Sequence, residues 1–243
     1  MTSTLDFFKA VKLDTGQSET TQIHEALRSA IIAMAMAPGE AVREEEICAG
    51  LSVSLASLRD AILQLANERF VVIEPEGQAR VAAIDIGEVL TGQIVRETLE
   101  VRITRLAARH FVPARATDFE HSLSLQDEAA KRHDTDEFFA LDHAFHQLIC
   151  EISGISNSWR ILHAATGQLD RVRRLAFAFE NSFDVVIAEH GAIYQGLKTR
   201  SEQAAVTALQ FQLDSMFENL RLLRKQHPDL FAEYGDINFD TIR

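Results

Sequence analysis

The sequence predicts a mainly α-helical protein with two domains: a small N-terminal one of three helices and a β-hairpin, then an antiparallel all-helical bundle. Three observations predict this class. Apolar residues recur at helical spacing through most of the chain, with one short interruption rich in β-branched residues. No proline occurs between Pro113 and Pro228, so long helices can form there without forced kinks. The 243 residues suffice for two ordinary domains.

The first 85 residues alternate short helices and turns before the hairpin. Residues 1–18 are polar and aperiodic, and we expect a flexible arm there. Gly50 suits the C-terminal cap of the second helix, and Ser54 suits the N-cap of the third. We assign residues 19–85 to the first domain. Its helices are predicted at 20–36, 43–50 and 55–68, and its strands at 70–74 and 79–82.

After Ile86 the chain shows only helical periodicity. We assign residues 86–226 to the all-helical domain and residues 227–243 to a loose C-terminal tail. The helices of this second domain are predicted at about 87–111, 115–132, 135–153, 156–179, 182–199 and 201–225.

Composition and motifs exclude several classes of protein. Cys48 and Cys150 have no CxxC partners, so we expect free thiols in a reducing compartment. No signal peptide and no apolar run of membrane-spanning length is present, so we expect a cytoplasmic protein without a membrane partner. Nucleophile elbow, phosphate-loop, dinucleotide and HExxH motifs are all missing, so we predict that the protein is not an enzyme.

Two short helices joined by a tight turn are typical of DNA readers, because the second helix can enter the major groove. The stretch from Ile23 to Asp85 also resembles the winged-helix domain of the GntR family of regulators. The resemblance rests on the Pro38-Gly39 turn, the helix at 44–51, Val53-Ser54, residues 58–61 and the strand ending at 79–81. It implies a winged helix-turn-helix domain that binds double-stranded operator DNA.

Four residues are candidates for DNA contact. Arg59 lies on the recognition helix and resembles the family's DNA-reading arginine, so it is placed to grip a guanine edge or a phosphate. Arg43 could reach a phosphate from the second helix, and Ser54 could donate to one where the recognition helix begins. Arg80 would sit on the wing. Each of the three arginines also fits the plainer interpretation of a solvated surface residue.

The acidity of the chain weighs against DNA affinity, because phosphate contacts supply most of that affinity. The net charge is −12, and residues 1–85 hold seven Lys and Arg against thirteen Asp and Glu, about −6. Leu55 also stands where family members usually carry a basic residue. The alternative is therefore a metabolite-binding sensor or interaction protein of the same fold that has lost specific DNA binding.

Asp142 and His146 are four residues apart, which puts a carboxylate and an imidazole on one helix face. Such a pair can ligate a divalent transition metal, although it often forms only a surface hydrogen bond. The stretch from residue 86 to 226 also resembles the FadR-type C-terminal domain of GntR regulators, FCD. That resemblance rests on residues 95–100, Asp142-xxx-His146, residues 169–175, Glu189-His190 and the helix from Ala204.

In many FCD domains an Asp and three His bind a metal, and Asp142, His146 and His190 match three of these four ligands. Gln212 stands at the fourth position and is a poor ligand for zinc or nickel, although its carbonyl can serve a harder ion. The site is thus either a three-ligand site for zinc, nickel or manganese, with open positions for water and effector, or one that has lost its metal.

Arg96 resembles the arginine at the start of the sensor domain. It would either clamp an effector carboxylate, with Gln212 nearby, or form a structural ion pair with Glu100. The resemblance implies a regulator that senses a small carboxylate metabolite. A homodimer would place two recognition helices on a palindromic site, and the effector would change their spacing.

Overall fold

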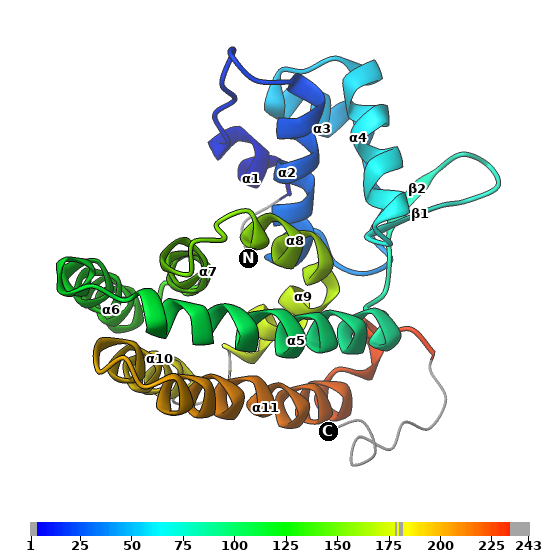
Figure 1. Ribbon diagram of the computed structural model, residues 1–243. Helices are drawn as coiled ribbons and strands as arrows, with labels where there is room; N and C mark the ends of the chain where they lie inside the picture. Colours follow the sequence, from blue (N-terminus) through cyan, green and yellow to red (C-terminus); the bar gives the residue numbers. More distant parts are fainter. Residues whose placement is uncertain (1–3, 178, 180–181, 234–243) are drawn as a thin grey trace. The chain divides into compact units, whose positions relative to one another are not determined.

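The computed structural model describes residues 4–177, 179 and 182–233. It confirms the predicted class: mainly helical, with a two-stranded antiparallel sheet in the N-terminal part and an all-helical part after it (Figure 1). The elements are α1 (Thr4–Ala10), α2 (Glu19–Ile32), α3 (Glu44–Leu51), α4 (Leu55–Asn67), β1 (Val71–Ile73), β2 (Ala79–Val81), α5 (Ile86–His110), η1 (Pro113–Arg115), α6 (Ala116–Lys131), α7 (Thr135–Ile152), α8 (Ser158–Ala165), α9 (Gly167–Ala176), α10 (Ser182–Lys198), α11 (Glu202–Gln226) and η2 (Pro228–Leu230).

The described residues form two compact units. One, which we call the head, contains the chain up to Asp85 together with His227–Glu233. The other, which we call the bundle, contains Ile86–Gln226.

The head is built on α2 and α4, which pack against each other, with α3 between them in sequence. Their inward faces carry fully buried aliphatic residues such as Ile23, Leu27 and Leu58. β1 and β2 pair antiparallel, with Val71 opposite Val81, and Gly77 takes a positive φ of 86° in the connecting turn. The hairpin therefore forms as the turn signals predict, because glycine adopts this conformation without strain.

The N-terminal segment is not the arm that the sequence predicts. Residues 4–10 form α1, and Phe8 is fully buried where α1 packs on α3. Gly50 faces this contact, since a Cβ there would lie 3.0 Å from the Cβ of Phe8. The prediction that Gly50 caps this helix is wrong, because α3 continues to Leu51 and its C-cap is Ser52, with a φ of 58°. Residues 1–3 lie outside the described residues.

The predicted loose tail is also partly wrong, because residues after α11 return to the head. Ile84 donates its N–H to Leu230 O at 2.9 Å, and Ala232 N donates to Ile84 O at 3.0 Å. Phe231 is buried by this contact. The remainder of the predicted tail, residues 234–243, lies outside the described residues.

In the bundle, α5 and α11 lie side by side, and α10 packs on α11 as well (Figure 1). A second group of contacts joins α6 to α7 and α10. One core cluster holds these helices together around Phe119, Phe145 and Tyr194, with Ile103 and Leu209 from α5 and α11. This core leaves one stretch of α7 facing polar residues instead, and the candidate site lies there.

The single helix predicted at 156–179 is instead two helices, α8 and α9, which break at Thr166. The Thr166 hydroxyl donates to Asp170 Oδ2 at 3.1 Å, and the Thr166 carbonyl accepts from Asp170 N at 2.7 Å. A threonine that bonds its own neighbours offers the backbone an alternative to a continuous helix. Part of the predicted range, residue 178, is not described.

Among the described residues, no helix combines the length and the apolar character needed to cross a membrane.

Candidate functional site

Ser54 is the N-cap of α4, the predicted recognition helix, and its hydroxyl oxygen accepts from Ser57 N at 3.1 Å. Ser54 Oγ also lies 3.3 Å from a carboxylate oxygen of Glu19. The predicted N-cap of α4 is therefore confirmed. Leu55 follows it with 43% of its surface exposed, so an apolar side chain stands at the exposed start of the helix.

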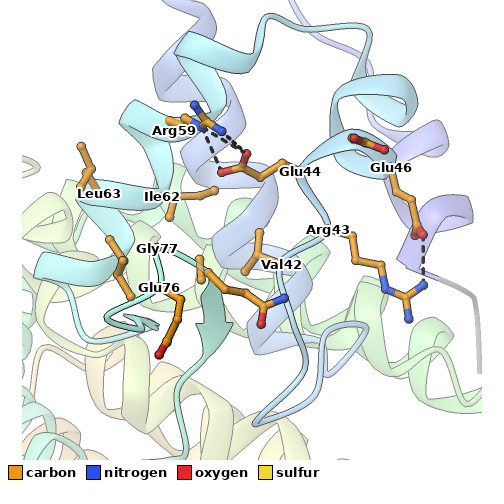
Figure 2. A pocket seen from close by; sticks show the side chains of 13 residues that line it. Val42, Arg43, Glu44, Glu46, Arg59, Ile62, Leu63, Glu76 and Gly77 are labelled. Carbon is orange, nitrogen blue, oxygen red and sulfur yellow. Dashed lines mark hydrogen bonds and ion pairs between the residues drawn. The ribbon is translucent and has the colours of Figure 1, made fainter.

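Arg43, directly before α3, and Arg59, on the predicted recognition helix α4, are both paired with carboxylates of α3 (Figure 2). Arg59 donates through Nε and a terminal nitrogen to Glu44, at 3.1 and 2.9 Å. Arg43 donates to Glu46 at 3.0 Å. More than 60% of each arginine side chain is exposed. Exposed ion pairs of this kind are weak, so a phosphate can displace the carboxylate from either arginine.

Arg80 lies on β2, at the base of the hairpin. It donates to Glu74 at 2.9 Å, to Gln78 at 2.9 Å and to the Gly39 carbonyl at 3.2 Å. Its side chain is 40% exposed. All four residues predicted to contact DNA thus lie on the surface of the head, and each has a partner within it.

In the bundle, Asp142 and His146 of α7 meet His190 of α10, and all three side chains are buried. Each offers one ligand atom, and these atoms lie within 4.8 Å of one another. The spacing within α7 accounts for the first pair, and the packing of α10 against the site supplies the third. Gln212 of α11 lies beside this cluster on the same cavity.

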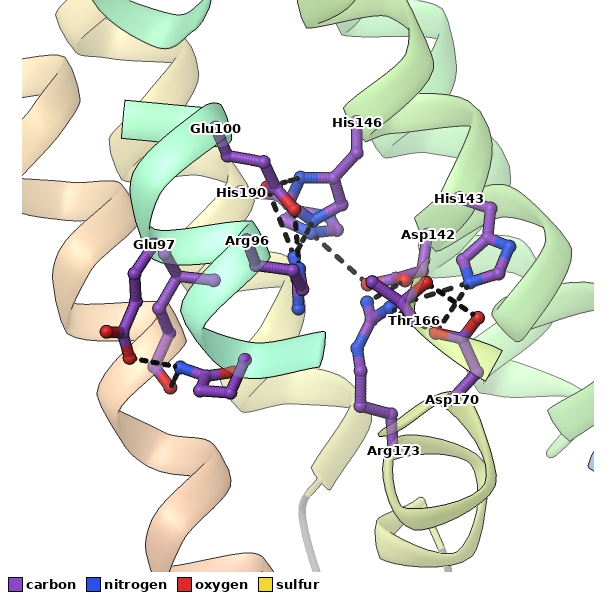
Figure 3. Close-up of polar contacts among 12 residues, drawn as sticks. Arg96, Glu97, Glu100, Asp142, His143, His146, Thr166, Asp170, Arg173 and His190 are labelled. Carbon is purple, nitrogen blue, oxygen red and sulfur yellow. Dashed lines mark hydrogen bonds and ion pairs between the residues drawn. The ribbon is translucent and has the colours of Figure 1, made fainter. Parts of the chain in front are cut away.

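The outer nitrogen of each imidazole is already occupied. His190 Nδ1 donates to the amide oxygen of Gln126 at 2.7 Å. His146 Nδ1 donates to a carboxylate oxygen of Glu100 at 3.0 Å (Figure 3). Because a carbonyl or carboxylate oxygen only accepts, both rings carry their proton on Nδ1 and present the Nε2 lone pair to the site.

Asp142 has the same kind of outer partner. Arg173 of α9 donates to its Oδ2, while Oδ1 lies 3.5 Å from His190 Nε2. Burial alone would raise the pKa of this carboxyl, but the Arg173 guanidinium and the two imidazoles hold it well below its usual value. Burial lowers the pKa of His190 to about 4. The three groups are therefore an ionised carboxylate and two imidazoles, at least one of them neutral, which is the state that binds a metal.

Three polar atoms around the site have no hydrogen-bond partner among the described residues: His190 Nε2, Gln212 Oε1 and Glu189 Oε1. Buried polar groups are nearly always satisfied, so an unpartnered lone pair beside a carboxylate points to a missing ligand. The three residues thus fit a divalent metal with two imidazole nitrogens and one carboxylate.

Arg96 of α5 is buried and bonds Glu100 at 2.5 and 3.2 Å. Its terminal nitrogen is also 3.4 Å from His146 Nε2. The ion pair with Glu100, one of the two predicted alternatives, is therefore formed. Arg96 also lines the cavity, so its guanidinium still faces the cavity although it is paired with Glu100.

Sequence reasoning missed three contributors: Gln126, Glu100 as an imidazole partner, and Arg173. Gln126 lies 64 residues from His190 in sequence, and no spacing connects them. Arg173 lies on α9 beside Arg171 and Arg174, and nothing in the sequence pattern separates it from them. In the structure it lies three residues after Asp170, to which it donates at 3.1 Å.

A second cluster lies beside the first. His143 and His163 approach Asp170, and His143 Nε2 lies 3.4 Å from Asp170 Oδ1. Arg173 reaches the same carboxylate oxygen. The Arg173 guanidinium already neutralises the Asp170 carboxylate, and this ion pair holds Arg173 in place against Asp142.

A cavity of about 200 Å³ reaches the first of these clusters at Asp142. Arg96, Asp142, Arg173, Glu189 and Gln212 line it at the ligand end. Burial raises the pKa of Glu189 to about 7. The cavity is thus placed to admit a small molecule beside the proposed metal.

Comparison with known families gives two matches in chain order. Residues 19–81 match "Bacterial regulatory proteins, gntR family", and residues 93–214 match the FCD domain. The chain belongs to the GntR family. It is a DNA-binding transcriptional regulator with an FCD domain and, like its family, not an enzyme. GntR regulators bind operator DNA and small-molecule effectors.

Full-length relatives support the assignment to the GntR family. A Streptomyces ambofaciens "Uncharacterized HTH-type transcriptional regulator in unstable DNA locus" is 32% identical, over 89% of this chain and 91% of its own. The Escherichia coli "HTH-type transcriptional repressor RspR" is 28% identical, over 91% and 97%. The Bacillus subtilis "Gluconate operon transcriptional repressor" is 26% identical, over 86% and 89%.

Solved structures show the same GntR fold. Escherichia coli McbR/YncC superposes with a TM-score of 0.73 at 17% identity, covering 87% of this chain and 99% of its own. A putative GntR regulator from Rhodococcus sp. RHA1 gives 0.68 at 25% identity, covering 84% and 98%.

Proposed function

We propose that this GntR regulator binds a divalent metal through Asp142, His146 and His190, and senses a small organic acid in the adjoining cavity. Gln212 would complete the metal site as a weak oxygen ligand. Zinc, nickel and manganese all suit two imidazoles with oxygen ligands. A divalent ion held there would offer an open coordination position to a carboxylate.

One observation carries the metal proposal. His190 donates its Nδ1 hydrogen to Gln126, which leaves Nε2 of this buried ring without a partner, 3.5 Å from Asp142 Oδ1. His146 donates its Nδ1 hydrogen to Glu100, and its Nε2 has only a long contact of 3.4 Å with Arg96. Metal-ligating histidines nearly always have such a partner, because it fixes the ring and its tautomer. A buried histidine that served only packing would not need its second nitrogen left without a partner.

On the protein side, Arg96, Arg173 and Gln212 would bind and orient the effector, since all three line the cavity. Arg173 also keeps Asp142 ionised, and Glu100 and Gln126 hold the two rings. Water in the cavity would be displaced by the carboxylate of the effector.

For the DNA side, we propose that Arg43, Ser54, Arg59 and Arg80 form the contact surface. A homodimer would present two such surfaces to a palindromic site, with half-sites about one helical turn apart. The effector changes operator affinity only if it binds the two arrangements of the heads with different affinity.

The test combines metal analysis with fluorescence anisotropy on the protein's own upstream DNA. His146→Ala with His190→Ala should abolish metal content and the response to organic acids, while metal-free DNA binding stays within about twofold. A double variant that responds normally would place the sensor site elsewhere. If the dissociation constant for this DNA is not below micromolar even at low salt, the result would instead favour a sensor that has lost specific DNA binding.

A further inference from the structure

The cavity continues away from the ligand cluster along two antiparallel helices. On α10 it is lined at every turn of one face, from Glu189 back through Val186 and Val185 to Ser182. On α11 the matching face runs from Gln212 through Ser215 and Met216 to Asn219. The spacing of three and four residues puts each set on one face. The cavity thus has a ligand end, at Glu189 and Gln212, and a far end.

The middle of the cavity is apolar apart from Ser215, whose hydroxyl already donates to the Gln212 carbonyl at 2.7 Å. Its wall on α9 consists of Val172 and Ala176, followed by Phe177, and all three are buried. Opposite them lie Val186 and Met216. An effector in this part would lose water without gaining hydrogen bonds, which favours alkyl or aromatic groups and disfavours hydroxyl groups.

The charged lining residues all belong to the ligand end: Arg96, Asp142, Arg173 and Glu189. At the far end the polar lining residues of the described chain are Ser182 and Asn219, which carry no charge. Among the described residues no cation lines the far end, so a second carboxylate there would gain no ion pair. The lining therefore selects one anionic group and one apolar body.

We infer that the effector is a small monocarboxylic acid with an apolar body, a branched alkyl chain or a single aromatic ring. Its carboxylate faces Arg96, Arg173 and the metal ligands, and its body lies against Ala176, Val186 and Met216. The cavity of about 200 Å³ restricts the effector to a small acid. This inference rests on the proposed function and narrows its effector class.

The first experiment is a titration of the metal-loaded full chain with a homologous series from acetate to pentanoate, by calorimetry. Each added methylene should tighten binding about three- to fourfold until the cavity is full. Phenylacetate and 3-methylbutanoate should bind at least tenfold more tightly than succinate or gluconate, and phenylacetamide should not bind. A flat series, no binding by any acid, or tighter binding of succinate or gluconate would overturn the inference.

The second experiment changes the apolar wall. Ala176→Leu, which fills the cavity, should weaken phenylacetate at least tenfold and leave acetate and metal content unchanged. Ala204→Leu adds the same bulk at an exposed position of α11 and should change nothing. Val186→Thr is a second probe: it keeps the volume, adds a hydroxyl and should weaken phenylacetate severalfold. Unchanged phenylacetate binding in both cavity variants would overturn the inference.

The two proposals fail in distinguishable ways. If the metal does not bind, or if no acid changes operator affinity, the proposed function fails. If metal binds and a polyhydroxy acid or dicarboxylate is the acid that changes operator affinity, the proposed function stands and the apolar-acid inference is wrong.

Discussion

At the scale of single residues, the candidate site depends on partners as much as on ligands. Asp142, His146 and His190 each contact a residue that fixes orientation or charge: Arg173, Glu100 and Gln126 in that order. Because these partners decide which nitrogen carries the proton, they would control the affinity for the proposed metal without contacting it.

Gln126→Leu should therefore weaken metal binding by about 10- to 100-fold while leaving all ligands in place. Gln126 is fully buried, and leucine has a similar volume, so the helix α6 should stay folded. The dissociation constant is measured by competition with a chromogenic chelator. Gln203→Leu, at an exposed position of α11, is the control. Equal affinities for the two variants would show that Gln126 does not orient His190.

In the head, Glu44 is the residue that holds Arg59. Glu44→Gln should tighten operator binding by at most about fivefold, since the Glu44 carboxylate no longer competes with the phosphate for Arg59. Glu45→Gln removes the same charge from α3 without removing the partner of Arg59, and serves as the control. Anisotropy titrations at one salt concentration compare them. Indistinguishable affinities would mean that Arg59 contacts no DNA group.

The sequence predicted the three residues of the proposed metal site but not their partners, for a physical reason. Asp142 and His146 share a helix face, so their spacing is visible in the sequence. His190 was predicted only through the resemblance to the FCD domain. Gln126 and Arg173 reach the site only through the packing of α6 and α9, and no local periodicity encodes which helices meet.

At the scale of elements, most helices and the hairpin follow from periodicity and turn residues, and the exceptions have local causes. Periodicity did not reveal α1, because seven residues are too few to show a pattern. The break at Thr166 depends on side chain bonds to Asp170. The return of residues 227–233 depends on backbone bonds to Ile84, which any sequence can make.

The crossing of α10 and α11 depends on Gly196. A Cβ there would lie 2.4 Å from the backbone nitrogen of Ala205 and 2.9 Å from its Cβ. Gly196→Ala should lower the free energy of unfolding by about 1–3 kcal/mol, because the helices must separate. Gly191→Ala in the same helix meets nothing within 4 Å and should be neutral or stabilising by up to about 1 kcal/mol. Urea unfolding followed by circular dichroism compares them; similar midpoints would contradict this packing.

The contact between α2 and the end of α4 should depend on pH. His24 is buried with Nε2 2.7 Å from Glu68, and hydrogen bonds to Glu25 and Glu68 raise its pKa to about 9. Because the folded pKa lies above the unfolded value of about 6.5, this stabilisation is complete below about pH 6.5 and is lost as pH rises through 9. Its size is on the order of 1 kcal/mol, since both carboxylates are more than a third exposed.

His24→Gln should therefore lose the decline in head stability between about pH 6.5 and 9 that the wild type shows. Amide hydrogen exchange in α2 and α4, corrected for the intrinsic rate at each pH, measures it within the head alone. An identical pH slope in the two proteins would mean that His24 is not charged in the folded state.

At the scale of the whole molecule, the chain connects the head and the bundle twice. The helix α5 begins directly after the head, and α11 ends directly before the segment that returns to it. Both helices also line the cavity, through Arg96 on α5 and through Gln212 and Met216 on α11. An effector that shifts either helix in the bundle therefore acts on an element that is covalently continuous with the DNA-binding unit.

The central claim is that the two imidazoles and one carboxylate in the bundle hold a divalent ion. The most direct measurement is elemental analysis of the tag-free full chain, purified without chelators, beside the variant in which His146 and His190 are alanine. We predict close to one zinc, nickel or manganese ion per chain in the wild type and background levels in the variant. A wild type at background after incubation with each ion, or a variant with full occupancy, would contradict the account.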